Sequence, residues 1–276
     1  MAKILLITGN HIRHQKFSEF VKIMDKHNVV GQIVQVREQT IPSPPKYLDN
    51  DLKNLWNLHF NKREESENNY LKPDRNDDYS NNALFVHSDR DLNSNESIKY
   101  VKECNPDVAL IQGVGIIRDD LYFSLPPYKI NFHMGLIPYF KGSITMFWPF
   151  YFLQPTLAGC TFHVIDKLVD TGMILHQMVP VLEKGDGIHD VASKACLAGY
   201  KDIQLVIDNV ENKIKNKIDP VMDKSLATKG KLFKKKDWKP EMLRVIYELF
   251  NDNIVDLYLD KKIKSPKPSL ITLDNL

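Results

Sequence analysis

The chain has 276 residues, longer than a typical single domain but shorter than two full-sized ones, so one main domain with an appendage is expected. Hydrophobic residues make up 43% of the chain and charged residues 26%, the balance of a globular protein with a sizeable core, which excludes a largely disordered chain. The 37 Lys and Arg residues nearly equal the 35 Asp and Glu residues, and a formal charge of +2 argues against nucleic acid or an acidic membrane as the main partner.

The chain begins with a strand pattern that is followed by a helix pattern. Residues 3–9, KILLITG, are apolar and β-branched as in a central parallel strand, and residues 14–27 have helical spacing. This first apolar run covers only about six residues, too few for a signal-peptide core, and no later run approaches the ~18 residues of a membrane helix. We therefore expect a cytoplasmic protein without a membrane partner. Residues 29–38 predict a second strand.

The composition changes over residues 45–80. A Pro-rich stretch, a charged helical segment at residues 52–71 and a polar, turn-rich stretch follow one another, which predicts a helical insertion between two loops. A third strand within residues 83–94, a helix over 95–104 and a fourth strand within 107–117 come next. Alternating strands and helices favour an α/β fold with a doubly wound, Rossmann-like, mostly parallel sheet.

The second half continues with three more strands, predicted within residues 129–135, 157–166 and 172–181. One long helix over residues 185–210 closes the domain. The expected catalytic domain therefore covers residues 1–215.

Residues 216–276 are predicted to form a small C-terminal subdomain. Part of it has helical spacing of apolar residues, which suggests a face that packs against another surface, and a homodimer through this helix is one hypothesis. These residues are Leu243, Val245, Ile246, Leu249 and Phe250.

Two polar side chains converge where one predicted strand ends. Asn131 and His133 are two positions apart in KINFHMG, so they point to the same side of the strand. The amide can donate to a carbonyl oxygen that gains negative charge, and the imidazole can hold a proton near neutral pH. Asp170, on a turn before the last strand, can orient the imidazole or accept the proton. Together these residues indicate acyl transfer, although each is also common as a structural element.

Other catalytic patterns were not found. The sequence has no nucleophile elbow and no HExxH, so the nucleophile is expected to come from the substrate. Its three cysteines form no CxxC or Cys/His pattern, so reduced thiols and no metal are expected. His163 and His176 lie inside strand patterns and are interpreted as structural. His11 and Arg13 follow the first strand at the ligand edge of the sheet, where a phosphate contact and a structural loop are the two alternatives.

Residues 131–177, from NFHMGLIPYFKGS to GCTFHVIDKLVDTGMILHQ, resemble the core of the folate-dependent formyltransferases. The family's Asn-x-His-x-Ser-Leu-Leu-Pro, Arg-Gly and Asp-x-Gly segments occur here in the same order. The resemblance implies that Asn131 and His133 polarise the formyl group of 10-formyltetrahydrofolate and that Asp170 assists proton transfer. It also implies contacts to the pterin ring from residues near the fourth strand and the Asp170 loop. These are Gln112, Gly113, Val114, Ile165, Asp166 and Val169.

The sequence departs from the family pattern at three positions. Met134 and Gly135 replace the family's Pro and Ser, and Lys141 stands where Arg is usual. A lysine cannot form the bidentate clamp of an arginine, so the contacts to the acceptor differ from the family's. Tyr139, Lys141 and Gly142, in PYFKG, are the residues expected at the acceptor's entrance.

The sugar-nucleotide N-formyltransferases resemble the chain best. They share its short C-terminal elaboration and the Pro-Tyr-x-(Arg/Lys)-Gly segment, which implies a nucleotide-linked amino sugar as acceptor, as in the synthesis of lipopolysaccharide O-antigens. Three alternatives stay open: a methionyl-tRNA formyltransferase-like enzyme, a 10-formyltetrahydrofolate hydrolase, and a binding protein that retains the fold without activity.

Overall fold

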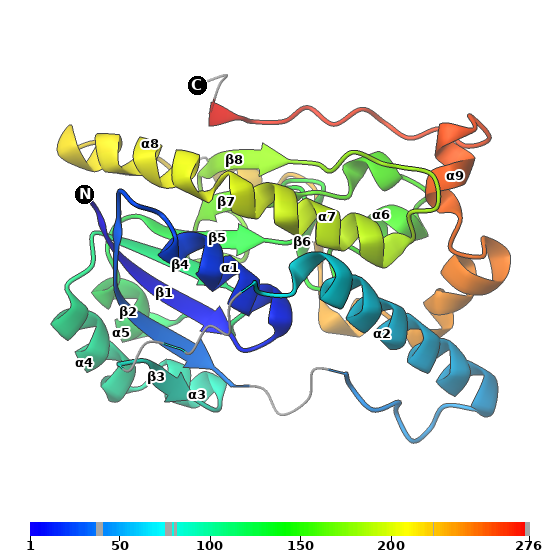
Figure 1. The fold of residues 1–276 in the computed structure, drawn as a ribbon, viewed down its shortest axis with the longest axis horizontal. Helices are drawn as coiled ribbons and strands as arrows, with labels where there is room; N and C mark the ends of the chain where they lie inside the picture. The colour runs from blue at the N-terminus through cyan, green and yellow to red at the C-terminus, as the bar shows by residue number, and fades with distance from the viewer. Residues whose placement is uncertain (37–40, 75–78, 80–81, 223, 274–276) are drawn as a thin grey trace.

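The structure, a computed structural model, describes residues 1–36, 41–74, 79, 82–222 and 224–273. Within these residues, seven strands form one sheet in the order β3-β2-β1-β4-β5-β7-β8. The first five strands in this order are parallel to one another, whereas β7 pairs antiparallel with both β5 and β8. The expectation of a doubly wound, mostly parallel sheet is confirmed (Figure 1).

The predicted strands all occur. The last two residues of the predicted strand 29–38 lie outside the described residues. The sheet contains β1 (Lys3–Gly9), β2 (Asn28–Gln35), β3 (Leu84–Val86), β4 (Val108–Gln112), β5 (Lys129–His133), β7 (Cys160–Val164) and β8 (Ile174–Met178), and a separate pair contains β6 (Phe140–Gly142) and β9 (Lys231–Phe233). The helices are α1 (Ile12–Lys22), α2 (Asn50–Leu71), α3 (Asp89–Leu92), α4 (Asn95–Cys104), α5 (Asp119–Ser124), α6 (Trp148–Tyr151), α7 (Ile188–Lys201), α8 (Ile203–Lys215) and α9 (Ile254–Leu259).

Different helices cover the two faces of the sheet. Successive side chains of a strand point to opposite faces, so Ile4 and Leu6 of β1 enter one core and Leu5 and Ile7 enter the other. The larger core contains residues of α1, α2, α7 and α8, and the smaller core contains residues of α3, α4 and α5. Burial on both faces explains why the strand sequences are continuously apolar.

The expectation of one helix over residues 185–210 was wrong, because the chain forms α7 and α8 with a break at Asp202. The Asp202 N–H donates to Gly199 O, so the helical hydrogen-bond ladder is interrupted there. Its carboxylate lies 3.1 Å from His176 Nε2 of β8, which holds the break against the sheet. No Gly or Pro marks this position, so the local sequence did not reveal it.

The predicted insertion contains α2, a helix of 22 residues whose apolar side packs on α1 and α7. Leu52, Leu55, Trp56 and Phe60 are buried in the main core. Residues 75–78 and 80 of the polar stretch behind it lie outside the described residues. Among the helices that the structure describes, none combines the length and the apolar character that a membrane crossing requires.

Residues beyond 215 pack into the same core as the sheet. Phe233, Leu243 and Ile246 are buried in the main core beside residues of α7. The predicted C-terminal helix is a 3-10 turn followed by a π-helical turn at Val245–Leu249, and Leu249 is exposed. The boundary near residue 215 stays a prediction, and side chains on both sides of it share one core.

The last described residues run along the outer edge of β8, as the red segment in Figure 1 shows. Gln177 N–H donates to Ile271 O at 2.8 Å, and Ile271 N–H donates to Gln177 Oε1 at 3.1 Å. Leu273 N–H donates to His176 Nδ1 at 3.2 Å. The edge strand of the sheet is therefore covered by the chain's own C-terminal segment.

Two buried histidines meet between α2, α7 and the π-helical turn. His59 Nδ1 lies 2.8 Å from Tyr247 Oη and 3.2 Å from His189 Nε2. Burial, with a smaller contribution from Arg63, lowers the pKa of His59 to about 3. Burial is also the largest cause that lowers the pKa of His189 well below its usual value, and His59 and Arg63 lower it further. Both rings are therefore neutral in the folded protein at neutral pH.

We expect these two rings to make the protein acid-sensitive. In the unfolded chain a histidine titrates near pH 6.5, so below that pH protonation favours unfolding by about 1.4 kcal/mol per pH unit for each ring. Above pH 6.5 this effect is absent. Urea unfolding at pH 7.5, 6.5 and 5.5 should show the unfolding free energy falling with pH. His59→Gln should remove the contribution of one histidine to that fall. The exposed His87→Gln is the matched control, and equal slopes in wild type and His59→Gln would contradict the expectation.

Candidate active site

The antiparallel pairing of β5 with β7 brings four polar side chains together. Asn131 lies opposite His163 and His133 lies opposite Thr161. Asn131 is half-buried, and the other three are buried. Because residues two apart on a strand share a face, all four lie on the same face of the sheet. From this face His133 and His163 reach Asp170, and the Thr161 hydroxyl donates to Gly135 O.

Asp170 is held between two imidazoles and a backbone donor. Its Oδ2 accepts a hydrogen bond from Gly142 N–H at 2.6 Å and lies 3.6 Å from His133 Nδ1. Its Oδ1 lies 3.4 Å from His163 Nε2. Asp170 itself has a φ of 53°, a left-handed conformation that aspartate tolerates better than most residues. The structure therefore brings together the three residues that were predicted to be catalytic.

Burial and the members of the cluster set its charges. Burial raises the pKa of Asp170, but His133, His163 and the Gly142 N–H outweigh this and hold that pKa well below its usual range. Burial lowers the pKa of His133, and the charge of Asp170 opposes that shift only in part. At neutral pH the site therefore holds an ionised carboxylate beside a neutral imidazole, which is the state that a proton acceptor requires.

The interpretation of His163 as a structural strand residue missed its place in this site. Its Nδ1 lies 3.1 Å from Val164 O, and its Nε2 faces both the Asp170 carboxylate and the Asn131 amide. That Nε2 lies 3.1 Å from Asn131 Nδ2, and one N–H of the Asn131 amide is used in this bond. The second N–H stays available for a carbonyl oxygen. The register that places His163 opposite Asn131 is not visible in the sequence, which is why the site role of His163 was missed.

Gly135 stands where the family pattern has serine, and the packing around it explains the glycine. A Cβ at this position would lie 2.4 Å from His133 Nε2 and 2.7 Å from Phe140 O. His133 Nε2 donates to the same Phe140 O at 3.1 Å. The space that a serine would need is thus occupied by this hydrogen bond.

We expect Gly135→Ser to lower turnover by about 10- to 100-fold, because the added atoms displace His133 or the Phe140 carbonyl. Overpacking should also cost about 1–3 kcal/mol of unfolding free energy. Turnover and urea unfolding measured on the same preparation separate the two effects. Wild-type turnover in Gly135→Ser would show that the site accommodates the family's serine.

The residues predicted to contact the pterin ring lie next to the catalytic cluster. Ile111 pairs with Asn131, so Gln112 to Val114 follow directly beside the end of β5. Gln112 Nε2 donates to Tyr200 Oη at 2.8 Å, which turns this side chain toward α7. The other predicted residues lie in the segment that leads to Asp170. Ile165 packs against the smaller core, and Val169 is 42% exposed. Asp166 Oδ1 accepts a hydrogen bond from Lys167 N–H. Their contacts to a pterin stay predictions.

The residues predicted to contact the acceptor lie in two places. His11 and Arg13 lie where β1 ends, and Arg13 Nη1 lies 2.6 Å from Glu67 Oε1 of α2. His11 and Glu67 line a cavity of about 120 Å³. Tyr139 is 37% exposed, whereas Lys141 is only 2% exposed and its ammonium donates to Leu226 O at 2.7 Å. The structure thus gives Lys141 a partner inside the protein.

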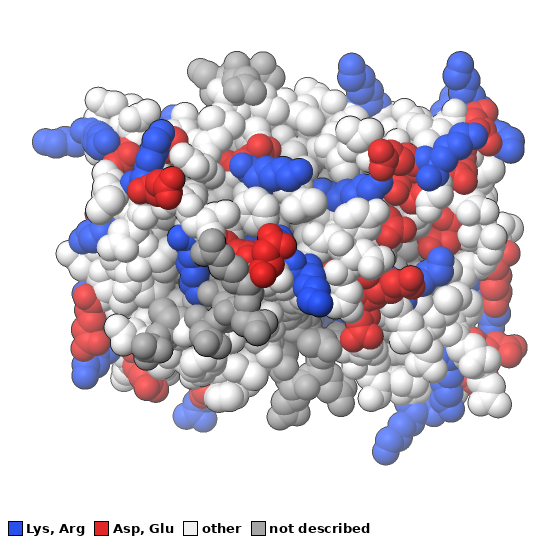
Figure 2. All heavy atoms as spheres, viewed as in Figure 1, with Lys and Arg blue, Asp and Glu red and all other residues white. Residues whose placement is uncertain are grey.

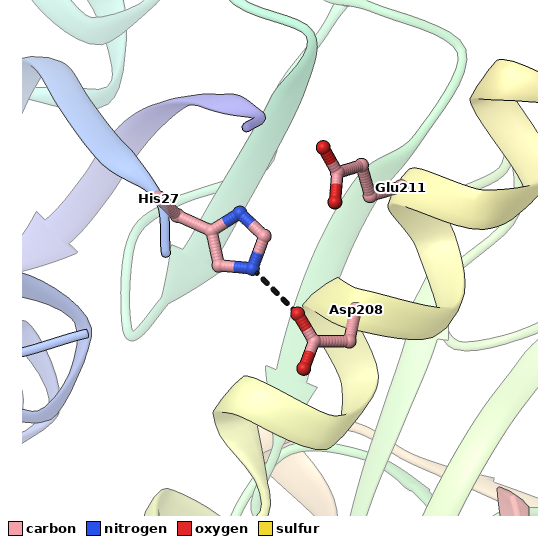
Figure 3. Close-up of side chains that lie close together, drawn as sticks. All are labelled: His27, Asp208 and Glu211. Atoms are coloured by element: carbon pink, nitrogen blue, oxygen red, sulfur yellow. Dashed lines mark hydrogen bonds and ion pairs between the residues drawn. The ribbon is translucent and has the colours of Figure 1, made fainter. Parts of the chain in front are cut away.

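One group of side chains in the described chain has the spacing of metal ligands. His27, Asp208 and Glu211 place ligand atoms within 4.8 Å of one another (Figure 3). His27 Nδ1 accepts Ala2 N–H at 3.3 Å, so Nε2 carries the proton and donates to Asp208 at 2.9 Å. Lys26 and Lys215 add positive charge to the two carboxylates. The group is therefore satisfied as a hydrogen-bonded ion-pair cluster, and it lies at the amino ends of β1 and β2, opposite the edge that carries Asp170.

Comparison with known sequences gives a family for most of the chain. A family model described as formyl transferase matches residues 7–207. The methionyl-tRNA formyltransferase of Thermodesulfovibrio yellowstonii is 26% identical over 155 residues, which cover 56% of this chain and 49% of that protein. That of a Sulfurihydrogenibium species is 26% identical over 161 residues, 58% of this chain and 50% of that protein. The chain thus spans about half the length of the curated relatives it matches.

Comparison with solved structures shows the same fold at low sequence identity. Glycinamide ribonucleotide transformylase 1 from Symbiobacterium toebii aligns with a TM-score of 0.53 and 19% identity, over 81% of this chain and 95% of that one. A 4-N formyltransferase from Francisella tularensis aligns with a TM-score of 0.51 and 19% identity, over 86% of this chain and 78% of that one.

Proposed function

The chain belongs to the formyl transferase family, and from this we propose that it moves a formyl group from 10-formyltetrahydrofolate to the amine of a nucleotide-linked amino sugar. The observation that carries the proposal is the Asp170 carboxylate between His133 and His163, with the Asn131 amide bonded to His163. Acyl transfer to an amine requires a hydrogen-bond donor to the carbonyl oxygen, a neutral imidazole and an ionised carboxylate.

In the proposed reaction each residue has one task. Asn131 donates its second N–H to the formyl oxygen as negative charge develops there. His133 and Asp170 receive the proton that the attacking amine loses when its nitrogen bonds to the formyl carbon. The same pair returns that proton to the folate nitrogen as its bond to the formyl carbon breaks. The proton count therefore balances without a further reactant.

The arrangement suits a folate donor. Asn131 is half-buried whereas His133 and His163 are buried, so among these residues it is the one that a bound carbonyl can reach most readily. When bound, 10-formyltetrahydrofolate would supply the formyl carbon and the leaving nitrogen. The segments 112–114 and 165–169 flank Asn131 and Asp170, and we propose that they hold the pterin ring.

Two features support a small acceptor. Side chains after residue 215, among them Phe233 and Ile246, are buried in the same core as the sheet. Figure 2 shows basic and acidic side chains interspersed on one face of the molecule, so no continuous basic surface for a polyanion is seen on that face. The solved 4-N formyltransferase from Francisella tularensis and a sugar N-formyltransferase from a Shewanella species share the fold. The names of the curated relatives favour methionyl-tRNA as the second candidate acceptor.

The test measures release of tetrahydrofolate from 10-formyltetrahydrofolate with three kinds of addition: none, a panel of dTDP-, UDP- and GDP-linked amino sugars, and methionyl-tRNA. Release that depends on an amino sugar is expected. Release that depends on methionyl-tRNA would replace the sugar by the second acceptor, and equal release without any amine would indicate a hydrolase. If tetrahydrofolate is released in none of the three arms, the proposal that the protein transfers a formyl group is overturned.

A further inference from the structure

The backbone donor that holds Asp170 belongs to a strand whose partner lies far along the chain. Gly142 is the last residue of β6, and among the described strands β6 pairs with β9. In the register, Gly142 lies opposite Phe233, and Ser143 N–H donates to Phe233 O at 2.8 Å. A Cβ at Gly142 would lie 2.1 Å from Phe233 O, so the two strands approach closely there. The position of β9 therefore sets the position of the Gly142 N–H.

Lys141 joins the same two segments from inside the protein. Its side chain is 2% exposed, and its ammonium donates to Leu226 O at 2.7 Å. Leu226 is itself buried in a small cluster with Ile137 and Ile174. The segment 224–233 thus lies along the segment 137–142, and Lys141 connects the two where burial makes the hydrogen bond costly to lose.

The ammonium also lies in the field of the catalytic carboxylate. Burial lowers the pKa of Lys141, and the charge of Asp170 opposes that shift. The titratable groups that face Asp170 therefore come from three strands: His133 of β5, Lys141 of β6 and His163 of β7.

We infer that Lys141 and β9 form a positioning device for Asp170, with Lys141 acting through the Gly142 N–H rather than by contact with the acceptor. The inference deepens the proposed function, because it states how the proton-accepting carboxylate is kept in place. It assigns a catalytic purpose to the segment 224–233 and gives Lys141 a role different from the acceptor contact expected from the sequence.

The test compares Lys141→Met, which keeps the length of the side chain without its charge, with Lys141→Arg, which restores a donor. In Lys141→Met, kcat should fall about 10- to 100-fold, since small misplacement of a catalytic group has effects of this size. The KM for the acceptor should stay within about twofold, and Lys141→Arg should recover most of kcat. The acid limb of the kcat profile should move to higher pH, because loss of a cation favours protonation of Asp170 and His133. Lys229→Met, an exposed lysine of the same segment, is the matched control.

A second readout needs no substrate. The amide proton of Gly142 in NMR reports its hydrogen bond to Asp170, and it should shift upfield in Lys141→Met but not in Lys229→Met. This arm tests the inference even if no acceptor supports turnover, so failure of the proposed function and failure of the inference are distinguishable. An unchanged Gly142 amide in Lys141→Met would overturn the inference. A raised acceptor KM with unchanged kcat would overturn it too, because Lys141 would then bind the acceptor.

Discussion

Replacement of Asp170 by asparagine is expected to lower acceptor-dependent turnover by about 10³–10⁴-fold. Asparagine has the same shape and can still accept the Gly142 N–H, so the loop should keep its position. It cannot take up a proton, and it cannot stabilise a cationic His133 across the 3.6 Å gap that separates the two groups. Single-turnover release of tetrahydrofolate measures the chemical step directly. Asp120→Asn, an exposed carboxylate of α5, is the control.

The same substitution has an expected effect on stability. Because the folded-state pKa of Asp170 is below its unfolded value of about 4, its ionisation stabilises the fold above that pH, and the contribution is lost as pH falls through the folded pKa. Asp170→Asn should therefore flatten the acid side of the stability curve while leaving a folded protein at pH 7. Full turnover in a folded Asp170→Asn would rule out proton transfer through this carboxylate.

The second large effect is expected at Gly172, two residues after Asp170. A Cβ there would lie 1.7 Å from Val164 O, a backbone atom that cannot move aside cheaply. Val164 N–H donates to Met173 O at 2.9 Å, so Gly172 lies where the Asp170 loop closes onto β7. Gly172→Ala should lower the unfolding free energy by about 3 kcal/mol or more, because either strand pairing or the loop must shift.

Turnover of the folded fraction of Gly172→Ala should fall about 100-fold, because the loop carries Asp170 with it. Urea unfolding and turnover are measured together. Gly185→Ala is the control, since a Cβ there meets nothing within 4 Å and adds only backbone strain at a φ of 88°, which costs about 1–2 kcal/mol. A Gly172→Ala midpoint equal to that of Gly185→Ala would show that the close approach has no energetic consequence.

The parts of the site that follow from local periodicity could be predicted from the sequence. The spacing of Asn131 and His133 gave their common direction, and the strand patterns gave the order of alternating elements. Asp170 required the family resemblance as well, because a polar turn residue has no periodicity that distinguishes it from other turns.

The parts that depend on pairing between distant segments could not be predicted. His163 reaches Asn131 only through the antiparallel register of β5 and β7, and the strand pattern of His163 alone is compatible with a structural role. The β6 and β9 strands have three residues each, too few for a recognisable pattern, yet they place the Gly142 N–H on Asp170. Likewise, the break at Asp202 depends on His176 of β8 and not on a helix-breaking residue.

The C-terminal segment along β8 has a consequence for how the molecule behaves in a crowded solution. An exposed strand edge offers main-chain N–H and C=O groups to any other strand, and proteins commonly shield such edges against aggregation. Here Ile271 O accepts the main-chain N–H of Gln177, and Ile271 N–H donates to the Gln177 side chain, at one edge of the sheet. At the opposite edge, β3 is only three residues long and offers little length for pairing. If the C-terminal segment left β8, the edge of β8 would therefore become a template for self-association.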